Sequence, residues 1–180
     1  MTLEEALVER RSVREYRRDP LKDAEIGQLL WAAQGITDPS GRRTAPSAGN
    51  LKSLEIYVLT GEGLYQYLPQ AHALKLHLSG DLQRELSAAA LDQECVLNAS
   101  AVFVIAAIYD RLSPKYGDDR SRRYAYMEAG HAAQNLLLQA AALGLAAVPA
   151  GAFTDDRVKK VLQLPAGQQP LYLIPVGYPK

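Results

Sequence analysis

A run of apolar residues, AVFVIAAIY at positions 101–109, restricts the fold more than any other part of the sequence. Its apolar side chains fall on both faces of an extended chain, which is typical of a strand at the centre of a sheet. The most apolar stretch, 99–108, has about half of the roughly twenty residues that a membrane-spanning helix needs. We therefore expect a mixed α/β fold around this strand, and no membrane partner.

Helical and extended patterns alternate along the rest of the chain. Thr2 and Glu5 have the spacing of a capping box, which opens a first helix, and Gly35 is a suitable end for a second. The longest helical pattern, 122–143, is apolar nearly all round, so this helix is buried or packs closely against a partner. Further strands are expected at 54–60, 64–68, 146–152 and 170–177, further helices at 82–91, 92–98 and 154–163, and loops at 36–50 and 110–121.

Composition narrows the class of protein. A length of 180 residues without a linker predicts one domain over 1–180. The 20 basic and 20 acidic side chains cancel, so nucleic-acid binding has little electrostatic support. The one cysteine, Cys95, cannot form an internal disulfide, and its apolar neighbours suggest an inert thiol. No apolar leader precedes the first helix, so the sequence predicts a soluble, cytoplasmic protein.

Several signatures of common catalytic folds are missing from the sequence. No strand is followed by G-x-G-x-x-G, and P-loop, H-E-x-x-H and G-x-S-x-G motifs are absent. Three widely spread histidines and one cysteine do not suit a zinc site, so no metal is expected. These absences argue against a Rossmann dinucleotide fold, a P-loop nucleotidase and a zinc enzyme.

The strongest chemical signal is RRSVR at 10–14, at the start of a basic run that ends at Arg18. Guanidinium forks and a hydroxyl suit a phosphate. Arg10, Ser12 and Arg14 would point the same way if the segment is extended. The alternative is a solvated arginine face that pairs with nearby carboxylates.

Two further segments have small residues beside regular elements. In 45–50 (APSAGN) a Pro-Ser pair precedes a short helix, and in 148–153 (VPAGAF) small residues follow a strand. Small side chains let the backbone approach a flat ligand, and amides at such ends can donate hydrogen bonds to it. Taken alone, each segment also fits an ordinary loop or strand–helix junction.

Taken together and in order, these segments resemble the nitroreductase family of flavin enzymes over nearly the whole chain. The resemblance rests on RRSVR, on PSAGN at 46–50, on EAGHAAQNL at 128–136, on VPAGAF and on PLYLIPVGYP at 170–179. The stretch EAGHAAQN and the preceding KYGDDRSRRY (115–124) look most like the SagB-type dehydrogenase branch, whose members oxidise thiazoline or oxazoline rings in peptides.

The resemblance implies an α/β (α+β) sandwich with a mixed, largely antiparallel sheet flanked by helices. It also implies an intertwined homodimer with two FMN molecules at the subunit interface. The implied activity is that of an FMN-dependent oxidoreductase, in which NAD(P)H reduces FMN and a small nitro- or quinone-type acceptor is then reduced by a ping-pong mechanism.

The family's motifs also imply which residues would contact FMN. One chain would hold the phosphate and one face of the ring, and the other chain would complete the site. Carried over by motif, Arg10, Arg11 and Ser12 would bind the phosphate and the ribityl chain, and Arg14 would lie at the pyrimidine edge of the ring. Pro149, Ala150 and Gly151 would pack on one face of the ring, and the N–H of Gly151 or Ala152 would lie near N5. The other subunit would line the ring and the ribityl chain with Pro46, Ser47, Ala48 and Asn50.

The sequence departs from the family at two points. Many members have several C-terminal cations near the phosphate, and here Lys180 is the one candidate. Gly151 stands where many classical members have glutamate. The flavin carries the chemistry, so no side chain is assigned a certain catalytic role. Lys115 and Tyr116 match a Lys-Tyr pair implicated in proton removal in the azoline-oxidising relatives, or they are an exposed lysine and a packed tyrosine.

Three functions are therefore compatible with the sequence. The first is an NAD(P)H-driven FMN reductase of small acceptors. The second is a SagB-type azoline dehydrogenase, in which the substrate reduces FMN. The third is a non-catalytic FMN-binding protein.

Overall fold

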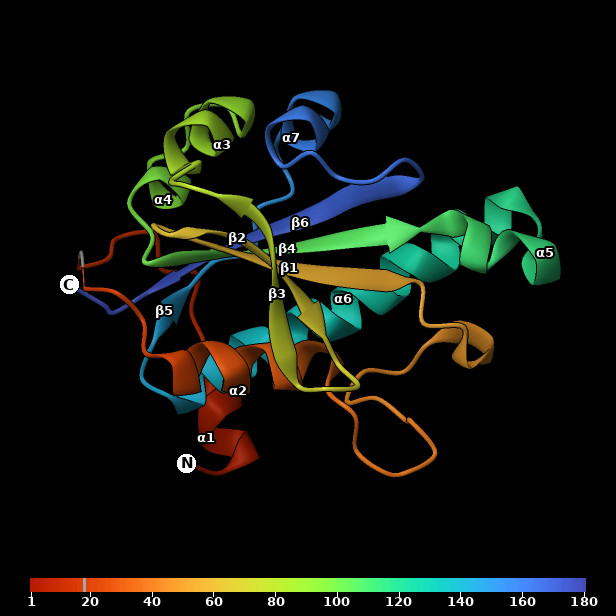
Figure 1. Cartoon of the computed structure of the whole chain (residues 1–180). Helices are drawn as coiled ribbons and strands as arrows, with labels where there is room; N and C mark the ends of the chain where they lie inside the picture. The colour runs from red at the N-terminus through yellow and green to blue at the C-terminus, as the bar shows by residue number, and fades with distance from the viewer. Residues whose placement is uncertain (18) are drawn as a thin grey trace.

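The computed structural model describes residues 1–17 and 19–180, and it shows a sheet with helices on both faces (Figure 1). Arg18, the end of the predicted basic run, lies outside the described residues. The strands are β1 (Leu54–Thr60), β2 (Gly63–Leu68), β3 (Ala73–Ser79), β4 (Ala101–Ile108), β5 (Ala146–Ala147) and β6 (Gln168–Gly177). The helices are α1 (Leu3–Glu9), α2 (Asp23–Gln34), α3 (Gln83–Ala89), α4 (Glu94–Leu97), α5 (Ser113–Tyr116), α6 (Asp118–Ala142) and α7 (Asp155–Val161), with 3₁₀ turns η1 (Ala48–Asn50) and η2 (Tyr109–Arg111).

Strand β4 lies inside the sheet, as its apolar sequence predicts. In the described part of the chain the strand order is β3-β2-β1-β4-β6-β5, and each strand pair is antiparallel. The side chains of β4 are buried from Ala101 to Ala107. An isolated parallel bridge joins Ser12 to Ala147 beside β5. The predicted α/β sandwich with a mixed, largely antiparallel sheet is therefore confirmed.

Different helices cover the two faces of the sheet, as Figure 1 shows. Helices α2 and α6 lie on one face, where Leu29, Phe103 and Leu136 belong to one fully buried cluster. Helices α3, α4 and α7 lie on the other face, in a cluster that includes Leu86 and Leu173. This two-sided covering explains why β4 has apolar residues at consecutive positions.

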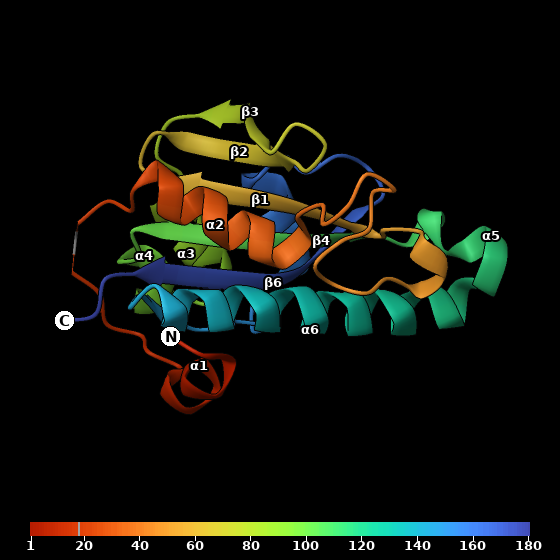
Figure 2. The same cartoon turned by 90° about the horizontal axis from the view of Figure 1, so that it is seen from below.

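Helix α1 lies apart from the sheet, against the far side of α6 (Figure 2). The predicted capping box is present: Glu5 N donates to Thr2 Oγ1 over 3.2 Å, and Thr2 N donates to Glu5 Oε2 over 2.6 Å. Within α1 only Ala6 is buried. Leu3, Leu7 and Val8 are 62%, 52% and 64% exposed. This helix therefore keeps an apolar surface that the single chain does not cover.

The boundaries differ from the sequence expectation at three places. The loop expected at 110–121 contains η2 and α5, and α6 begins at Asp118, because Gly117 with φ 74° separates two helical segments. The strand expected at 146–152 is reduced to β5. Strand β3 was not expected. In the described ranges 1–17 and 19–180, none of the helices combines the length and hydropathy that crossing a membrane requires.

Candidate functional site

The arginine segment runs extended along the edge of the sheet. Val13 N donates to Ala147 O over 3.1 Å, and Ser12 forms its parallel bridge with the same residue. The chain that follows Ala147 leads directly into 149–152. The fold therefore brings two of the predicted FMN-binding segments, 10–14 and 149–152, to one edge of the molecule.

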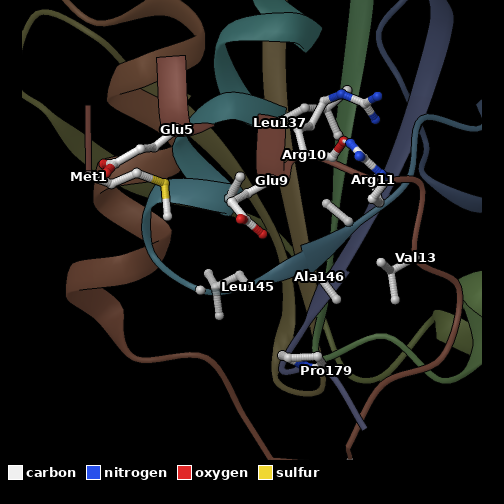
Figure 3. A pocket seen from close by; sticks show the side chains of 13 residues that line it. Met1, Glu5, Glu9, Arg10, Arg11, Val13, Leu137, Leu145, Ala146 and Pro179 are labelled. Atoms are coloured by element: carbon white, nitrogen blue, oxygen red, sulfur yellow. Dashed lines mark hydrogen bonds between the residues drawn. The ribbon is translucent and has the colours of Figure 1, made fainter. Parts of the chain in front are cut away.

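A pocket of about 640 Å³ opens beside this segment (Figure 3). Its wall includes Leu137 and Ala141 in the last turns of α6 and residues after the helix, such as Leu145. In Figure 3 the guanidinium groups of Arg10 and Arg11 lie together, on the side away from Met1. The pocket is lined by Met1, Glu5, Glu9, Arg10, Arg11, Val13, Leu137, Ala141, Gly144, Leu145, Ala146, Ala147 and Pro179.

Backbone atoms hold two of the arginine side chains. Arg11 Nη1 donates to Val8 O over 2.6 Å and to Arg10 O over 2.9 Å. Arg14 Nη1 donates to Ser12 O over 3.4 Å. Arg11, Ser12 and Arg14 are exposed. The segment therefore presents guanidinium groups and a hydroxyl at the surface, where an anion can reach them.

Residues 149–152 divide into a part bound to the sheet and an open part. Ala150 N donates to Leu173 O over 2.7 Å, and Leu173 N donates back to Ala150 O over 3.0 Å. Gly151 and Ala152 are exposed, and a Cβ built on Gly151 would meet no described atom within 4 Å. The amide of Ala150 is therefore used by the sheet, whereas open space borders Gly151.

A side chain of α6 binds the loop at 46–50. Ser47 Oγ donates to Glu128 Oε2 over 2.7 Å and accepts from Lys52 N over 2.8 Å. The hydroxyl of Ser47 is thus engaged inside the protein. Glu128, which is 1% exposed, was not predicted as a functional residue. Its one signal in the sequence was an acidic residue within the small and apolar pattern of the long helix.

Lys115 and Tyr116 contact this same loop. A Cβ built on Gly49 would lie 2.6 Å from Tyr116 Oη and 2.9 Å from Lys115 Nζ. Tyr116 also packs edge-to-face on Tyr124, with ring centroids 4.9 Å apart. The fold therefore gathers the Lys-Tyr pair and the 46–50 loop into one group.

The two groups of predicted residues lie at different places along α6 (Figure 2). Glu128 contacts Ser47, whereas Ala141 lines the pocket of Arg10 and Arg11. At 1.5 Å per residue, Glu128 and Ala141 are about 20 Å apart along the helix axis. Figure 2 shows α5 beyond one end of α6 and the C-terminus of the chain near the other.

Lys180 lies near the arginine segment but pairs elsewhere. Its Nζ is 3.7 Å from Glu15 Oε2, and both side chains are exposed. The preceding Pro179 forms a bridge with Tyr16 and lines the pocket. An exposed pair of this kind stabilises little, so the pairing does not fix Lys180 in place.

Cys95 is unsuited to a nucleophilic role. The residue is 6% exposed, and burial raises the pKa of its thiol above the ordinary value, although the nearby Arg14 lowers it in part. The thiol form therefore dominates at neutral pH, in agreement with the interpretation of Cys95 as an inert side chain.

Comparison with known proteins identifies the family. The profile of the nitroreductase family matches residues 7–178. A Methanocaldococcus jannaschii protein named as a nitroreductase is 45% identical, over 97% of this chain and 90% of its own length. The microcin B17-processing protein McbC of Escherichia coli is 30% identical over 82% of this chain, which spans 58% of McbC.

Solved structures agree with the sequence comparisons. A Ralstonia eutropha JMP134 structure named as a nitroreductase superposes with a TM-score of 0.90 at 27% identity, and covers 100% of this chain and 84% of its own. An E. coli microcin synthetase McbBCD complex gives a TM-score of 0.81 at 27% identity, over 92% of this chain and 67% of that chain. The profile match, these relatives and the shared fold establish that the chain belongs to the nitroreductase family and is an oxidoreductase.

Proposed function

We propose that this protein is an FMN-dependent oxidoreductase that uses NADH or NADPH to reduce a small acceptor of the nitro or quinone type. The observation that carries the proposal is the edge of the sheet where the exposed Ser12 forms a bridge with Ala147, four residues before Gly151, which is exposed with open space beside it. Cations with a hydroxyl suit a phosphate, and an open glycine suits close approach of a planar ring. The residues present therefore fit FMN.

Each segment would have a separate task in binding. Arg10, Arg11 and Ser12 would hold the phosphate and ribityl chain, with Lys180 as a further candidate cation for the phosphate. Arg14 would lie at the pyrimidine edge, where a cation favours negative charge on the reduced ring. Ring contacts would come from Pro149, Ala150, Gly151 and Ala152.

The remaining contacts would come from a second copy of the chain. Pro46, Ser47, Ala48 and Asn50 would line the ring and ribityl chain from the partner subunit. Ser47 would do so through its backbone, since its hydroxyl bonds to Glu128. The separation of about 20 Å along α6 supports this division, because one chain does not bring the two groups together. Exposed apolar side chains support a homodimer: Leu3, Leu7 and Val8 on α1, and Tyr126 and Met127 on α6.

The catalytic contribution of the protein would be to bind and orient. Bound FMN would accept a hydride from the nicotinamide and then pass two electrons to the acceptor, so the two substrates would react in turn by a ping-pong mechanism. The N–H of Gly151 or Ala152 would donate a hydrogen bond at the ring atom that accepts the hydride. The single cysteine supports a reducing compartment such as the cytoplasm.

A spectrum of the purified protein tests this proposal. We expect the yellow absorption of oxidised flavin and a mass in solution of two chains. Anaerobic addition of NADH or NADPH should bleach the colour, and a quinone or nitroaromatic should restore it. A colourless protein that takes up no added FMN would refute the proposal, and a yellow protein that neither nicotinamide bleaches would refute the NAD(P)H-driven reaction.

One observation favours a second candidate function, azoline oxidation. Lys115 Nζ and Tyr116 Oη both lie against Gly49, in the loop that would face the ring. The similarity to McbC points to the same branch of the family. A lysine and a phenol at this position could remove a proton from a thiazoline or oxazoline ring while FMN accepts the hydride.

Variants of the Lys-Tyr pair separate the two functions. If the protein oxidises azolines, Lys115→Ala and Tyr116→Phe should each abolish oxidation of a thiazoline-containing peptide while FMN stays bound. If it reduces small acceptors, both variants should keep most of their nicotinamide-driven quinone reduction. Tyr124→Phe is the matched control, because Tyr124 packs on Tyr116, whereas the atoms nearest to a Cβ built on Gly49 belong to Tyr116 and Lys115. Equal loss in Tyr116→Phe and Tyr124→Phe would argue for a packing role alone.

A further inference from the structure

Glu128 is a buried carboxylate among small apolar side chains of α6. Its Oε2 accepts from Ser47 Oγ at 2.7 Å, from Ser53 Oγ at 2.8 Å and from Ser53 N at 3.4 Å. Its Oε1 is buried and has no hydrogen-bond partner among the described residues. Burying a carboxylate with one oxygen unpaired is costly, and Ala125 and Ala132 fill the same helix face without that cost. Packing alone therefore does not explain why a carboxylate stands at position 128.

The segment bracketed by the two serines has a strained backbone. Gly49, Asn50 and Lys52 have φ values of 58°, 57° and 54°. For residues other than glycine this left-handed conformation is unfavourable, and it persists where surrounding contacts enforce it. Glu128 binds both ends of the segment, because Ser47 and Ser53 stand on either side of the three residues.

A second contact fixes the same loop to α6. Asn135 Nδ2 donates to Thr44 O over 3.1 Å. Glu128 and Asn135 lie about two helical turns apart on α6, and so on one face of the helix. The helix thus holds the loop on both sides of Pro46, and of these two contacts the one from Glu128 to Ser47 is nearer in sequence to Ala48 and Asn50.

We propose that Glu128 is a positioning residue for the flavin site. Through Ser47 and Ser53 it fixes the backbone of 47–53, so that Ala48 and Asn50 are presented for the cofactor and Gly49 lies against Lys115 and Tyr116. Glu128 acts through the loop rather than by contact with the cofactor. The effect on FMN binding rests on the proposed function, whereas the effect on the loop does not.

Two substitutions of Glu128 with different hydrogen-bonding capacity test this proposal. Glutamine can place an oxygen where Oε2 stands and keep all three hydrogen bonds, and leucine removes them at similar volume. We expect Glu128→Leu to raise the dissociation constant for FMN at least about tenfold, and Glu128→Gln to change it less than about threefold. Ser87→Ala is the control for general destabilisation, because it removes a buried hydroxyl of α3 far from the loop.

Hydrogen exchange of the apo-protein provides a readout that does not depend on FMN. Peptides covering 45–54 should exchange faster in Glu128→Leu than in Glu128→Gln, while peptides from β4 exchange alike in both. Unchanged exchange in this loop would overturn the proposal, and so would equal losses of FMN binding in the two variants. If the parent protein binds no FMN, the proposed function fails and the exchange experiment still decides the role of Glu128.

A milder variant keeps the test decisive if Glu128→Leu does not fold. Ser53→Ala removes one donor to Oε2 and leaves the other two in place. Faster exchange in 45–54 is expected for this variant as well. Exchange equal to that of the parent protein would overturn the proposal.

Discussion

Replacing Arg10 and Ser12 together with alanine is expected to raise the dissociation constant for FMN about 100-fold. The reason is that hydrogen bonds to a charged group contribute about 1.5–3 kcal/mol each, and every 1.4 kcal/mol is a factor of ten in affinity. Ser12 is exposed beside Ala147, so its replacement leaves the buried core intact. Titration of apo-protein with FMN, followed by quenching of flavin fluorescence, measures the effect.

The matched control removes a positive charge from the same basic segment, at a residue that is not predicted to contact FMN. Arg17 pairs with Asp19 at 3.5 Å and lies over the ring of Tyr178. Arg17→Ala should therefore leave FMN affinity close to that of the parent protein. Equal FMN content in the parent protein and in the Arg10→Ala, Ser12→Ala variant would remove these residues from the phosphate site.

Local patterns predicted the central strand and the helices other than α5, but not every edge of the sheet. The sequence of β3 alternates apolar Leu74 and Leu76 with polar side chains, so the period was visible. Both leucines are exposed on this edge strand, at 42% and 53%, and of the strand's leucines only Leu78 packs against a buried cluster, so burial hardly distinguishes the segment from a polar loop. Strand β5 is short because Pro149 and the opposing Pro175 have no N–H to donate to the ladder.

In the candidate site, too, features formed by adjacent residues could be predicted, whereas contacts between residues far apart in the sequence could not. The segment 10–14 could be predicted because its chemistry is contained in adjacent residues. The bond from Ser47 to Glu128 could not, since 81 positions separate the two residues and only the packing of α6 under the loop brings them together. The contact of Gly49 with Lys115 and Tyr116 depends on the same packing.

The second large effect is expected when two defective chains are combined. Arg10→Ala with Ser12→Ala damages one half of each proposed site. Asn50→Asp damages the other half, because it exchanges amide donors for a negative charge while Asp tolerates the φ of 57° at this position. In the proposed dimer, each variant alone would form a homodimer in which both sites carry a defect. In a mixed dimer, one site would carry both defects and the other would carry none.

Coexpression of the two variants with different affinity tags, followed by tandem purification, isolates the mixed dimer. Its FMN content and its nicotinamide-driven quinone reduction are the measurements that test most directly whether two chains build each flavin site. We predict recovery to about half of the parent protein's values, since a twofold dimer has two equivalent sites and one of them is intact. A mixed dimer no better than either parental homodimer would contradict a shared site and place each flavin within a single chain.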